Sequence, residues 1–371
     1  MAKPNIPPTQ KNTAKPTPAA LDEATPNNGD SKAEADHLRS RVGLIDLSNR
    51  DRLCLLGEDR HRFLNGQITN NIRDLRPGFG CYSLTVNNKG IIQGDCTVYS
   101  LADEILLDLE PNHGEALATH LNGFIVSDDV EIVDVAPHFG LISIQGPLAL
   151  LVLENAPFIQ ASNLPTKSYS ITQVSLEGES EIYAANHPRG GRTGYDLFIS
   201  SDRLKELRTA LILMVREQGG DLCGPEGLET LRIEAGIPRF PIDMKPSVLA
   251  PELRQEERTI SYSKGCYVGQ EVINRIKSIG KVKRELVGIT FDTSKPLDNF
   301  SGKFLYHQEK RVGFVTSVTF SEPAGQYIGL AIVKTIASEP GNRLIIADEN
   351  LSDPTEAKVT TLPFSVSNKT Q

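Results

Sequence analysis

Alternating apolar and polar residues divide the first part of the chain into short strands separated by helices. Period-two alternation predicts strands, and apolar residues three or four positions apart predict helices. From about residue 40 the pattern predicts a strand, a helix, three strands, a second helix and a closing strand. The segments are a strand at 51–57, a helix at 59–72, hairpin arms in "FGCYSLTVN" and "GIIQGDCTVYS" joined at "NKG", a strand in "EILLDLE", a helix at 112–124 with Asn112 as its N-cap, and a strand in "VEIVDV".

The same order of elements then recurs. The strand "LISIQG" ends at Gly146, as the earlier strand ends at Gly57, and "PLALLVLENA" follows as a helix with proline at its first position. Strand-like runs lie near 169–176, 180–185 and 195–199, and a helix at 202–218 is stopped by two glycines. We therefore predict two related α+β units facing a shared cleft.

The last part of the chain has a different pattern. A helix at 225–236 begins at Pro225 and ends at Gly236, and from about residue 281 the chain is strand-like with frequent turns. This predicts a small C-terminal β-barrel. The expected domains are an α+β domain at 39–280, with units at 39–138 and 139–240 and a cysteine-containing segment at 241–280, and a barrel at 281–371.

Residues 1–38 contain almost no large apolar side chain and many prolines, threonines and asparagines. Such a composition cannot offset the entropy lost on ordering, so we predict a disordered tail. The tail lacks the apolar stretch of a secretory signal. No run of apolar residues in the chain reaches the roughly 18 that a membrane-spanning helix requires, and we expect no membrane partner.

The net charge, the cysteines and the absence of certain motifs exclude several classes of function. The net charge of −8 disfavours a protein whose whole surface binds nucleic acid. The five cysteines are odd in number and sparse, which favours a reducing, cytoplasmic setting over a disulfide framework. The chain has no CxxC, HExxH, Walker or GxGxxG pattern. We therefore expect no metal site, and the patterns exclude a metalloprotease, a P-loop NTPase and a simple dinucleotide-binding domain.

The stretch "KGCYVGQEV" (264–272) contains the cysteine of greatest interest. An apolar stripe predicts a helix beginning near Val268, so that Cys266 lies just before a helix N-terminus. The helix dipole and the Lys264 ammonium would both stabilise a thiolate there, and Gln270 and Glu271 could face the same pocket. The alternative is that Cys266 is a small buried apolar residue.

Basic residues are concentrated around this motif. Six of them lie between Lys264 and Arg284, against the single acid Glu271; the six are Lys264, Arg275, Lys277, Lys281, Lys283 and Arg284. This basic strip could face RNA or an acidic partner. It could equally be a solvated helix face.

Three further residues are candidates for binding or catalysis, each with a structural alternative. Asp196 in "RTGYDLF" could accept paired hydrogen bonds from a flat heterocycle, or it could belong to a turn or salt bridge. Arg232 in "LRIEAGIPR" could bind a carboxylate, or it could form an ordinary ion pair. Asp95 in "NNKGIIQGDCTV" could assist proton movement at a bound amine, or it could cap a turn.

Taken together, these stretches resemble a known family. "KGCYVGQEV" followed by "GKVKREL", together with "FLNGQITNNI", "GCYSLTVNNKG", "LISIQGP" and "LRIEAGIPRFPID" in the same order, resembles the folate-binding YgfZ family. That family includes mitochondrial factors that mature [4Fe–4S] proteins, and it is related to the T-protein (aminomethyltransferase) of the glycine cleavage system. The resemblance implies a T-protein-like α+β fold: duplicated α+β units around a central folate pocket, then a C-terminal barrel.

The resemblance also implies tetrahydrofolate as the cofactor. Asp196, beside Tyr195 in "GYD", falls where the T-protein carries its pterin-binding glutamate, and the loop before it is shorter here. Arg232, Gln270 and Glu271 are the other expected folate contacts. Asp95 falls near the aspartate associated with aminomethyl transfer, although its neighbours differ. The cysteine motif belongs to the YgfZ side of the superfamily.

These observations lead to one expected function and two alternatives. We expect a folate-binding accessory factor that supports iron–sulfur enzymes, including tRNA-modifying ones, with Cys266 and Lys264 as reactive residues and client or assembly proteins as partners. The first alternative is a tetrahydrofolate-dependent aminomethyltransferase that uses Asp95. The second is a binding module that docks RNA or an acidic protein on the basic strip.

Overall fold

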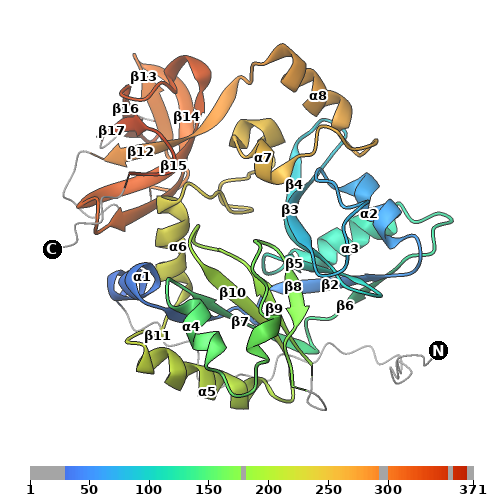
Figure 1. The fold of residues 1–371 in the computed structure, drawn as a ribbon. Helices are drawn as coiled ribbons and strands as arrows, with labels where there is room; N and C mark the ends of the chain where they lie inside the picture. Colours follow the sequence, from blue (N-terminus) through green and yellow to red (C-terminus); the bar gives the residue numbers. More distant parts are fainter. Residues whose placement is uncertain (1–29, 177–180, 292–299, 350–353, 366–371) are drawn as a thin grey trace.

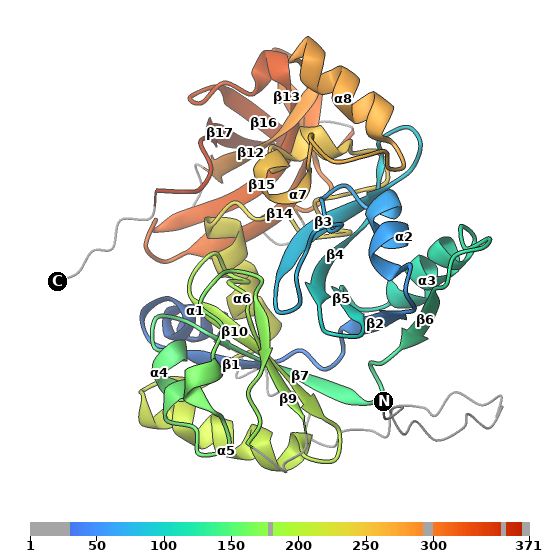
Figure 2. The same cartoon turned by 45° about the vertical axis from the view of Figure 1, so that its right-hand side comes forward.

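The computed structural model describes residues 30–176, 181–291, 300–349 and 354–365. Within them the chain forms two α+β units and a β-barrel, with the helix α6 (Pro225–Glu234) between the barrel and the second unit (Figures 1 and 2). No described helix is long and apolar enough to cross a membrane.

The first unit is built on a five-stranded sheet in the order β3-β4-β5-β2-β6. Its apolar face packs on two helices through residues such as Leu64, Leu107 and Leu121, which are fully buried. The elements are β2 (Asp51–Leu56), α2 (Arg60–Gln67), β3 (Gly80–Val86), β4 (Ile92–Ser100), β5 (Ile105–Leu109), α3 (Gly114–Asn122) and β6 (Glu131–Asp134).

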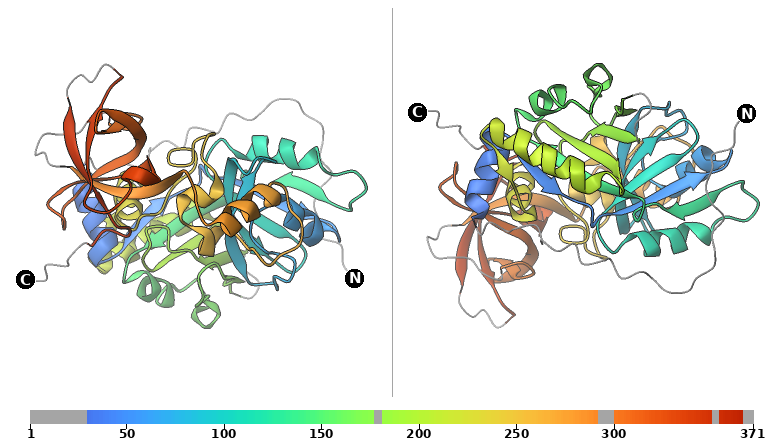
Figure 3. Two further views of the ribbon diagram at one scale, coloured as in Figure 1. Left: turned by 90° about the horizontal axis from the view of Figure 1, so that it is seen from above. Right: turned by 90° about the horizontal axis from the view of Figure 1, so that it is seen from below.

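The second unit is built on a six-stranded sheet in the order β11-β1-β7-β10-β9-β8. The helices α4 and α5 cover its outer face, which is seen from below in Figure 3. Because β1 precedes the first unit in the chain and β7 follows it, the second sheet is built from strands on both sides of the first unit. The elements are β1 (Gly43–Asp46), β7 (Phe139–Gln145), α4 (Ala149–Glu154), η1 (Ala161–Asn163), β8 (Ile171–Gln173), β9 (Ile182–Asn186), β10 (Gly194–Ser200), α5 (Leu204–Glu217) and β11 (Asp221–Leu222).

The two sheets share the same order of strands and helices and the same strand pairing. In each, a strand is followed by a helix and then by three antiparallel strands, the last of which pairs with the first: β2 with β5, and β7 with β10. The strands β2 and β7 are both followed by a glycine with positive φ, 97° at Gly57 and 123° at Gly146. A Cβ atom at either position would collide with a backbone oxygen, of Asp129 or Arg41 respectively. The predicted recurrence is therefore present in the strand order.

Two sequence predictions about segment ends need correction. The tail predicted to reach residue 38 ends earlier, since α1 (Ser31–Ser40) is a helix capped by Asp30. Its Leu38 is fully buried and its Arg39 pairs with Glu234 of α6, which supplies the burial that composition alone did not reveal. The rest of the predicted tail, residues 1–29, lies outside the described residues.

The second correction concerns the cap of α3. Asn112 has a φ of 66° and does not cap the helix. Instead, the side chain of Asp51 accepts hydrogen bonds from the backbone N–H groups of His113 and Gly114, at 2.8 and 2.6 Å. The N-cap function is thus supplied from β2, which is distant in sequence.

A segment of short helices connects the second unit to the barrel. It comprises η2 (Ala250–Leu253), α7 (Glu256–Thr259) and α8 (Gln270–Ile279), which lies at the edge of the molecule beyond β3 and β4 (Figures 1 and 3). The described strands after it close into a barrel in the order β12-β15-β14-β13-β16-β17, as the sequence predicted. They are β12 (Arg284–Phe291), β13 (Phe304–His307), β14 (Lys310–Ser321), β15 (Gln326–Lys334), β16 (Arg343–Ala347) and β17 (Thr355–Thr360), with η3 (Thr335–Ala337) after β15.

Candidate functional site

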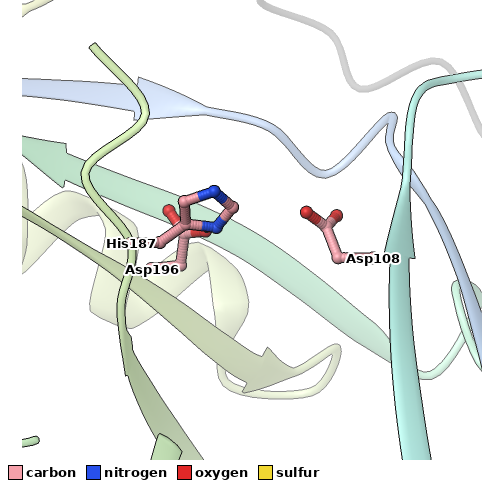
Figure 4. A group of neighbouring side chains, drawn as sticks. All are labelled: Asp108, His187 and Asp196. Atoms are coloured by element: carbon pink, nitrogen blue, oxygen red, sulfur yellow. The ribbon is translucent and has the colours of Figure 1, made fainter. Parts of the chain in front are cut away.

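Buried charged residues meet where the two sheets face each other. Asp108 belongs to β5 of the first sheet and Asp196 to β10 of the second, and both are fully buried. Figure 4 shows Asp108 on its own strand, opposite His187 and Asp196. Buried carboxylates need partners of opposite charge or hydrogen-bond donors, so their arrangement defines what this centre can bind.

Arg189, in the loop between β9 and β10, joins the two carboxylates. Its Nη2 lies 2.6 Å from Asp196 Oδ2 and 2.7 Å from Asp108 Oδ2. Its Nε lies 3.1 and 3.0 Å from the two carboxylate oxygens of Asp196. The guanidinium therefore makes a forked, two-point contact with Asp196, the geometry in which arginine binds a carboxylate most strongly.

The remaining hydrogen-bonding capacity of Asp196 is also used. Ser143 Oγ donates to its Oδ1 at 2.7 Å, and His187 Nδ1 lies 3.0 Å from its Oδ2. Burial opposes ionisation of Asp196, but Arg189 and His187 outweigh burial and lower its pKa. Asp196 is thus a fully partnered carboxylate in this structure.

Asp108 is held by a second arginine from its own unit. Arg50 donates from Nε to Oδ1 at 2.8 Å and from Nη2 to Oδ2 at 3.1 Å, and its Nη1 pairs with Glu110. Burial opposes ionisation of Asp108, but the guanidinium groups of Arg50 and Arg189 hold its pKa well below the ordinary value. Alternating acids and arginines therefore run from Glu110 on the first sheet to Asp196 on the second.

Asp95 of β4 is close enough to Glu110 to feel its charge, but it has a different environment from Asp108 and Asp196. It is half-buried, and the hydroxyl of Tyr82 donates to its Oδ2 at 2.6 Å. Burial, with a smaller contribution from the negative charge of Glu110, raises its pKa to about 6. The ring of Tyr82 is covered by the guanidinium of Arg258, 4.3 Å from the ring centroid. Asp95 can therefore hold or release a proton near neutral pH.

Three groups in this centre also have the composition of a metal site. Ligand atoms of Asp108, His187 and Asp196 lie within 4.8 Å of one another. However, Arg189 Nη2 lies at hydrogen-bonding distance from both carboxylates, so its positive charge already occupies the position that a cation would take.

Tyr195 does not share this site with Asp196. Adjacent residues on a strand point to opposite faces, and Tyr195 packs in the apolar core among residues such as Val42 and Leu197. Burial raises the pKa of its hydroxyl. The structure therefore places Tyr195 away from the centre that contains Asp196, and the expected contact with folate stays a prediction.

Arg232 is buried and all of its N–H donors are used. Nε and Nη2 donate to Glu229, Nη1 donates to Ile237 O at 2.9 Å and to Asp243 at 2.7 Å, and Nη2 also donates to Ser317 of β14 at 2.8 Å. With five donors engaged, none is free for a ligand carboxylate. The expected folate contact is not supported, and Arg232 instead fixes α6 to the barrel.

Lys264 is also buried, and it points away from solvent. Its Nζ donates to the backbone oxygens of Asn65, Ile68 and Asn70 at 2.6, 2.8 and 2.6 Å. Burial lowers its pKa to about 8. The expected role of Lys264 in activating a thiolate is not supported, because all three ammonium hydrogens go to the carbonyl groups at the end of α2.

Cys266 is exposed, whereas Cys54, Cys96 and Cys223 are buried and Cys81 is half-buried. The predicted helix begins as expected: Gly269 is the N-cap of α8 and Gln270 its first residue.

The two polar residues at the start of α8 do not reach the central acids. Gln270 Nε2 lies 3.5 Å from Lys264 O, and Glu271 is exposed to solvent. Both lie near Cys266. The sequence analysis assigned them to the same folate site as Asp196, whereas the fold places them at a separate site.

The basic strip is smaller than the sequence suggested. Lys264 is buried, and Arg284 pairs with the buried Glu252 at 2.9 Å. The four members that remain exposed are Arg275, Lys277, Lys281 and Lys283. A cleft of about 490 Å³ adjoins it, lined by Ile91, Ser247, Leu249, Glu252, Lys283, Arg284 and Lys334.

Several residues of the central site were not found from the sequence, among them Arg50, Asp108, His187 and Arg189. Asp108 gave one usable signal, since it is a charged residue inside the otherwise apolar strand "ILLDL". A charge at such a position is buried only with a partner. The identity of that partner could not be predicted, because Arg189 comes from the other unit.

Comparison with known proteins agrees with this fold. A model of the GCVT N-terminal domain matches residues 17–256, and one of the glycine cleavage T-protein C-terminal barrel domain matches residues 284–365. The chain belongs to the glycine cleavage T-protein family. Its relatives include aminomethyltransferases of Geobacillus sp. (strain WCH70), 26% identical over 90% of each chain, and of Anoxybacillus flavithermus, 27% identical over 83% of each.

A solved structure confirms the expected fold class of this family member. The glycine cleavage system aminomethyltransferase T of Bartonella henselae superposes with a TM-score of 0.78 at 19% identity, over 89% of this chain and 88% of that chain. The T-protein-like α+β fold with a C-terminal barrel is therefore confirmed. At this identity the likeness concerns the fold alone.

The central site does not fit tetrahydrofolate with every side chain in its present position. A pterin ring would need free acceptor positions on Asp196, but Ser143, His187 and Arg189 use them. Asp95, by contrast, keeps partial access to solvent.

Proposed function

We propose that this chain is an accessory factor of the YgfZ type, which binds tetrahydrofolate and uses Cys266 in the assembly or repair of iron–sulfur enzymes, including those that modify tRNA. The observation that carries the proposal is the exposure of this thiol. Cys266 is the exposed member of the five cysteines, and burial raises the pKa of the other four. A partner protein can therefore reach Cys266, while the others are shielded.

The residues on either side hold this thiol in a defined place. Lys264 is fixed by three carbonyl groups, and the side chain of Tyr267 is buried in the apolar core. Gly265 between them has open space around its Cα. Cys266 is thus displayed on a short loop whose two ends are anchored, a geometry suited to an encounter with another protein.

A single thiol sets a limit on the chemistry. A [4Fe–4S] cluster takes four ligands, and Cys266 supplies one. The cluster is therefore cargo whose other ligands come from the donor or the client protein, and it is not a resident cofactor of this chain.

The test is a Cys266→Ser variant in cells that lack the natural protein. We expect normal folding and normal binding of a reduced folate, with the activity of a [4Fe–4S] client enzyme falling to the level of the deletion. Ser263→Ala, an exposed change in the same loop, is the matched control and should retain full activity. Full client activity in Cys266→Ser would exclude this mechanism.

A tetrahydrofolate-dependent aminomethyltransferase is a second candidate, and one observation favours it. Asp95 has a pKa raised to about 6 beside the Tyr82 hydroxyl, which suits a group that moves a proton to or from an amine. This candidate predicts turnover of an aminomethylated lipoyl carrier with tetrahydrofolate, lost in Asp95→Asn. Absence of turnover in the wild-type protein would remove it.

Docking of RNA or an acidic partner on the basic strip remains a prediction. Its exposed members are Lys281, Lys283, Arg275 and Lys277. Reversal of charge at Lys281 and Lys283 should weaken such docking while Cys266→Ser leaves it unchanged. If the charge-reversed variant and Cys266→Ser bind the partner equally well, the strip is not the contact surface.

A further inference from the structure

Arg189 and a pterin ring present the same hydrogen-bonding edge. A pterin carries an amino group next to ring nitrogens, so part of the ring is chemically a guanidine. The Nε and Nη2 groups of Arg189 offer the corresponding pair of donors to Asp196, with Nε 3.1 Å from its Oδ1 and Nη2 2.6 Å from its Oδ2. The protein has thus bound a guanidine of its own at the carboxylate that a pterin would require.

We propose that Arg189 is an internal occupant of the pterin-binding position at Asp196, and that it sets the affinity for folate because a reduced folate reaches Asp196 only when Arg189 moves aside. This inference rests on the proposed binding of folate. It adds a residue that determines ligand affinity and specificity, which neither the sequence pattern nor the family comparison indicates.

The surrounding contacts allow this exchange without leaving an unpaired buried acid. When Arg189 departs, Asp108 keeps the two hydrogen bonds from Arg50, at 2.8 and 3.1 Å. Asp196 keeps Ser143 and His187 and gains the donors of the pterin. The exchange therefore breaks two ion pairs of Arg189, one with Asp196 and one with Asp108, and the pterin replaces only the first.

The position of Arg189 in the chain is compatible with such a movement. It lies in a loop and not within β9 or β10, and Gly190 and Gly191 follow it directly. Its backbone N–H is held by Gln145 Oε1 at 3.2 Å, so the backbone can stay fixed while the long side chain rotates. Arginine has enough side-chain torsions for this without any rearrangement of the sheet.

The experiment compares a double variant, whose net charge equals that of the wild type, with a single-substitution control. Arg189→Ala combined with Asp108→Asn removes the occupant together with one of the two acids that it neutralises. Asp108→Asn alone is the control. Isothermal titration with 5-formyltetrahydrofolate should give a Kd at least about tenfold lower for the double variant than for the control, because no internal guanidinium competes for Asp196.

A small guanidine provides a second readout that does not depend on activity. Methylguanidine should raise the melting temperature of the double variant and compete with 5-formyltetrahydrofolate, and it should do neither with the wild-type protein. If the double variant fails to fold, Arg189→Lys replaces it, because lysine keeps the charge but loses the forked contact. Its Kd should then lie below that of the wild type.

The outcomes separate this inference from the proposed function. Equal or weaker folate binding by the variants that lack Arg189, with clear binding by the wild type, would overturn the role of Arg189 and leave folate binding intact. Folate binding that methylguanidine does not reduce in the double variant would overturn it as well. If neither the wild type nor any variant binds 5-formyltetrahydrofolate, both this inference and the proposed binding of folate are wrong.

Discussion

Replacement of Asp95 by asparagine should stabilise the protein in a pH-dependent manner. The pKa of Asp95 rises from 3.8 in an unfolded chain to about 6 in the folded protein, first because of burial and then because of Glu110. The folded state therefore binds the proton more tightly. In the wild-type protein this group makes stability fall as pH rises from about 4 to about 6, and the cost persists at higher pH.

The magnitude follows from the size of the shift. About two pKa units correspond to about 3 kcal/mol, and because Asp95 is only half-buried we expect about 2 kcal/mol. Asparagine is neutral at every pH and can still accept from the Tyr82 hydroxyl. The free energy of unfolding of Asp95→Asn should therefore exceed that of the wild type by about 2 kcal/mol at pH 8, with almost no difference near pH 4.

The assay is urea unfolding between pH 4 and pH 8, followed by circular dichroism and tyrosine fluorescence, since the chain has no tryptophan. Asp74→Asn, at an exposed aspartate, is the control and should stay within about 0.5 kcal/mol of the wild type at each pH. A stability difference that does not change with pH, or a destabilised Asp95→Asn at pH 8, would refute the reasoning.

Three further predictions follow from the contacts of single residues. Lys264→Met should cost about 3 kcal/mol or more because three buried carbonyl groups lose their donor; urea unfolding measures this against the exposed Lys281→Met. Arg232→Met should cost about 3–5 kcal/mol by breaking a buried ion pair, and limited proteolysis should show a loosened barrel. Gly146→Ala should cost well over 1 kcal/mol because of its positive φ and the nearby Arg41 oxygen, whereas Gly66→Ala in α2 should be neutral or stabilising by calorimetry.

Each of these three has a result that would contradict it. Equal losses in Lys264→Met and Lys281→Met would mean that the buried ammonium adds nothing to stability. If Arg232→Met leaves the barrel resistant to proteolysis but weakens folate binding, Arg232 contacts the ligand after all. A thermal transition of Gly146→Ala equal to that of Gly66→Ala would show that the turn accepts a side chain.

The sequence by itself determined most of the fold. The strands β2 to β5 and the hairpin between β3 and β4 follow from period-two alternation, and α5 and α6 follow from helical spacing with Gly219 and Pro225 at their ends. The barrel was predictable because its strands are separated by frequent turns. These signals are local: each depends on residues within a few positions of one another.

The sequence also singled out Asp95, Asp196 and Cys266, because each residue type stands out in its own segment. It did not reveal that Lys264, Arg232 and Tyr195 are buried, each with its own partners or packing, because a side chain's partner and the side of the sheet that it faces depend on what packs against it.

Only the tertiary structure decided the composition of the central site. Arg189 meets Asp108 across two sheets, and Arg50 approaches from a strand connection far away in sequence. Charge pairing of this kind depends on distances of a few ångströms between elements that no local pattern relates. For the same reason Lys264 could be read as a neighbour of Cys266, whereas the fold directs its ammonium to the carbonyl groups of α2.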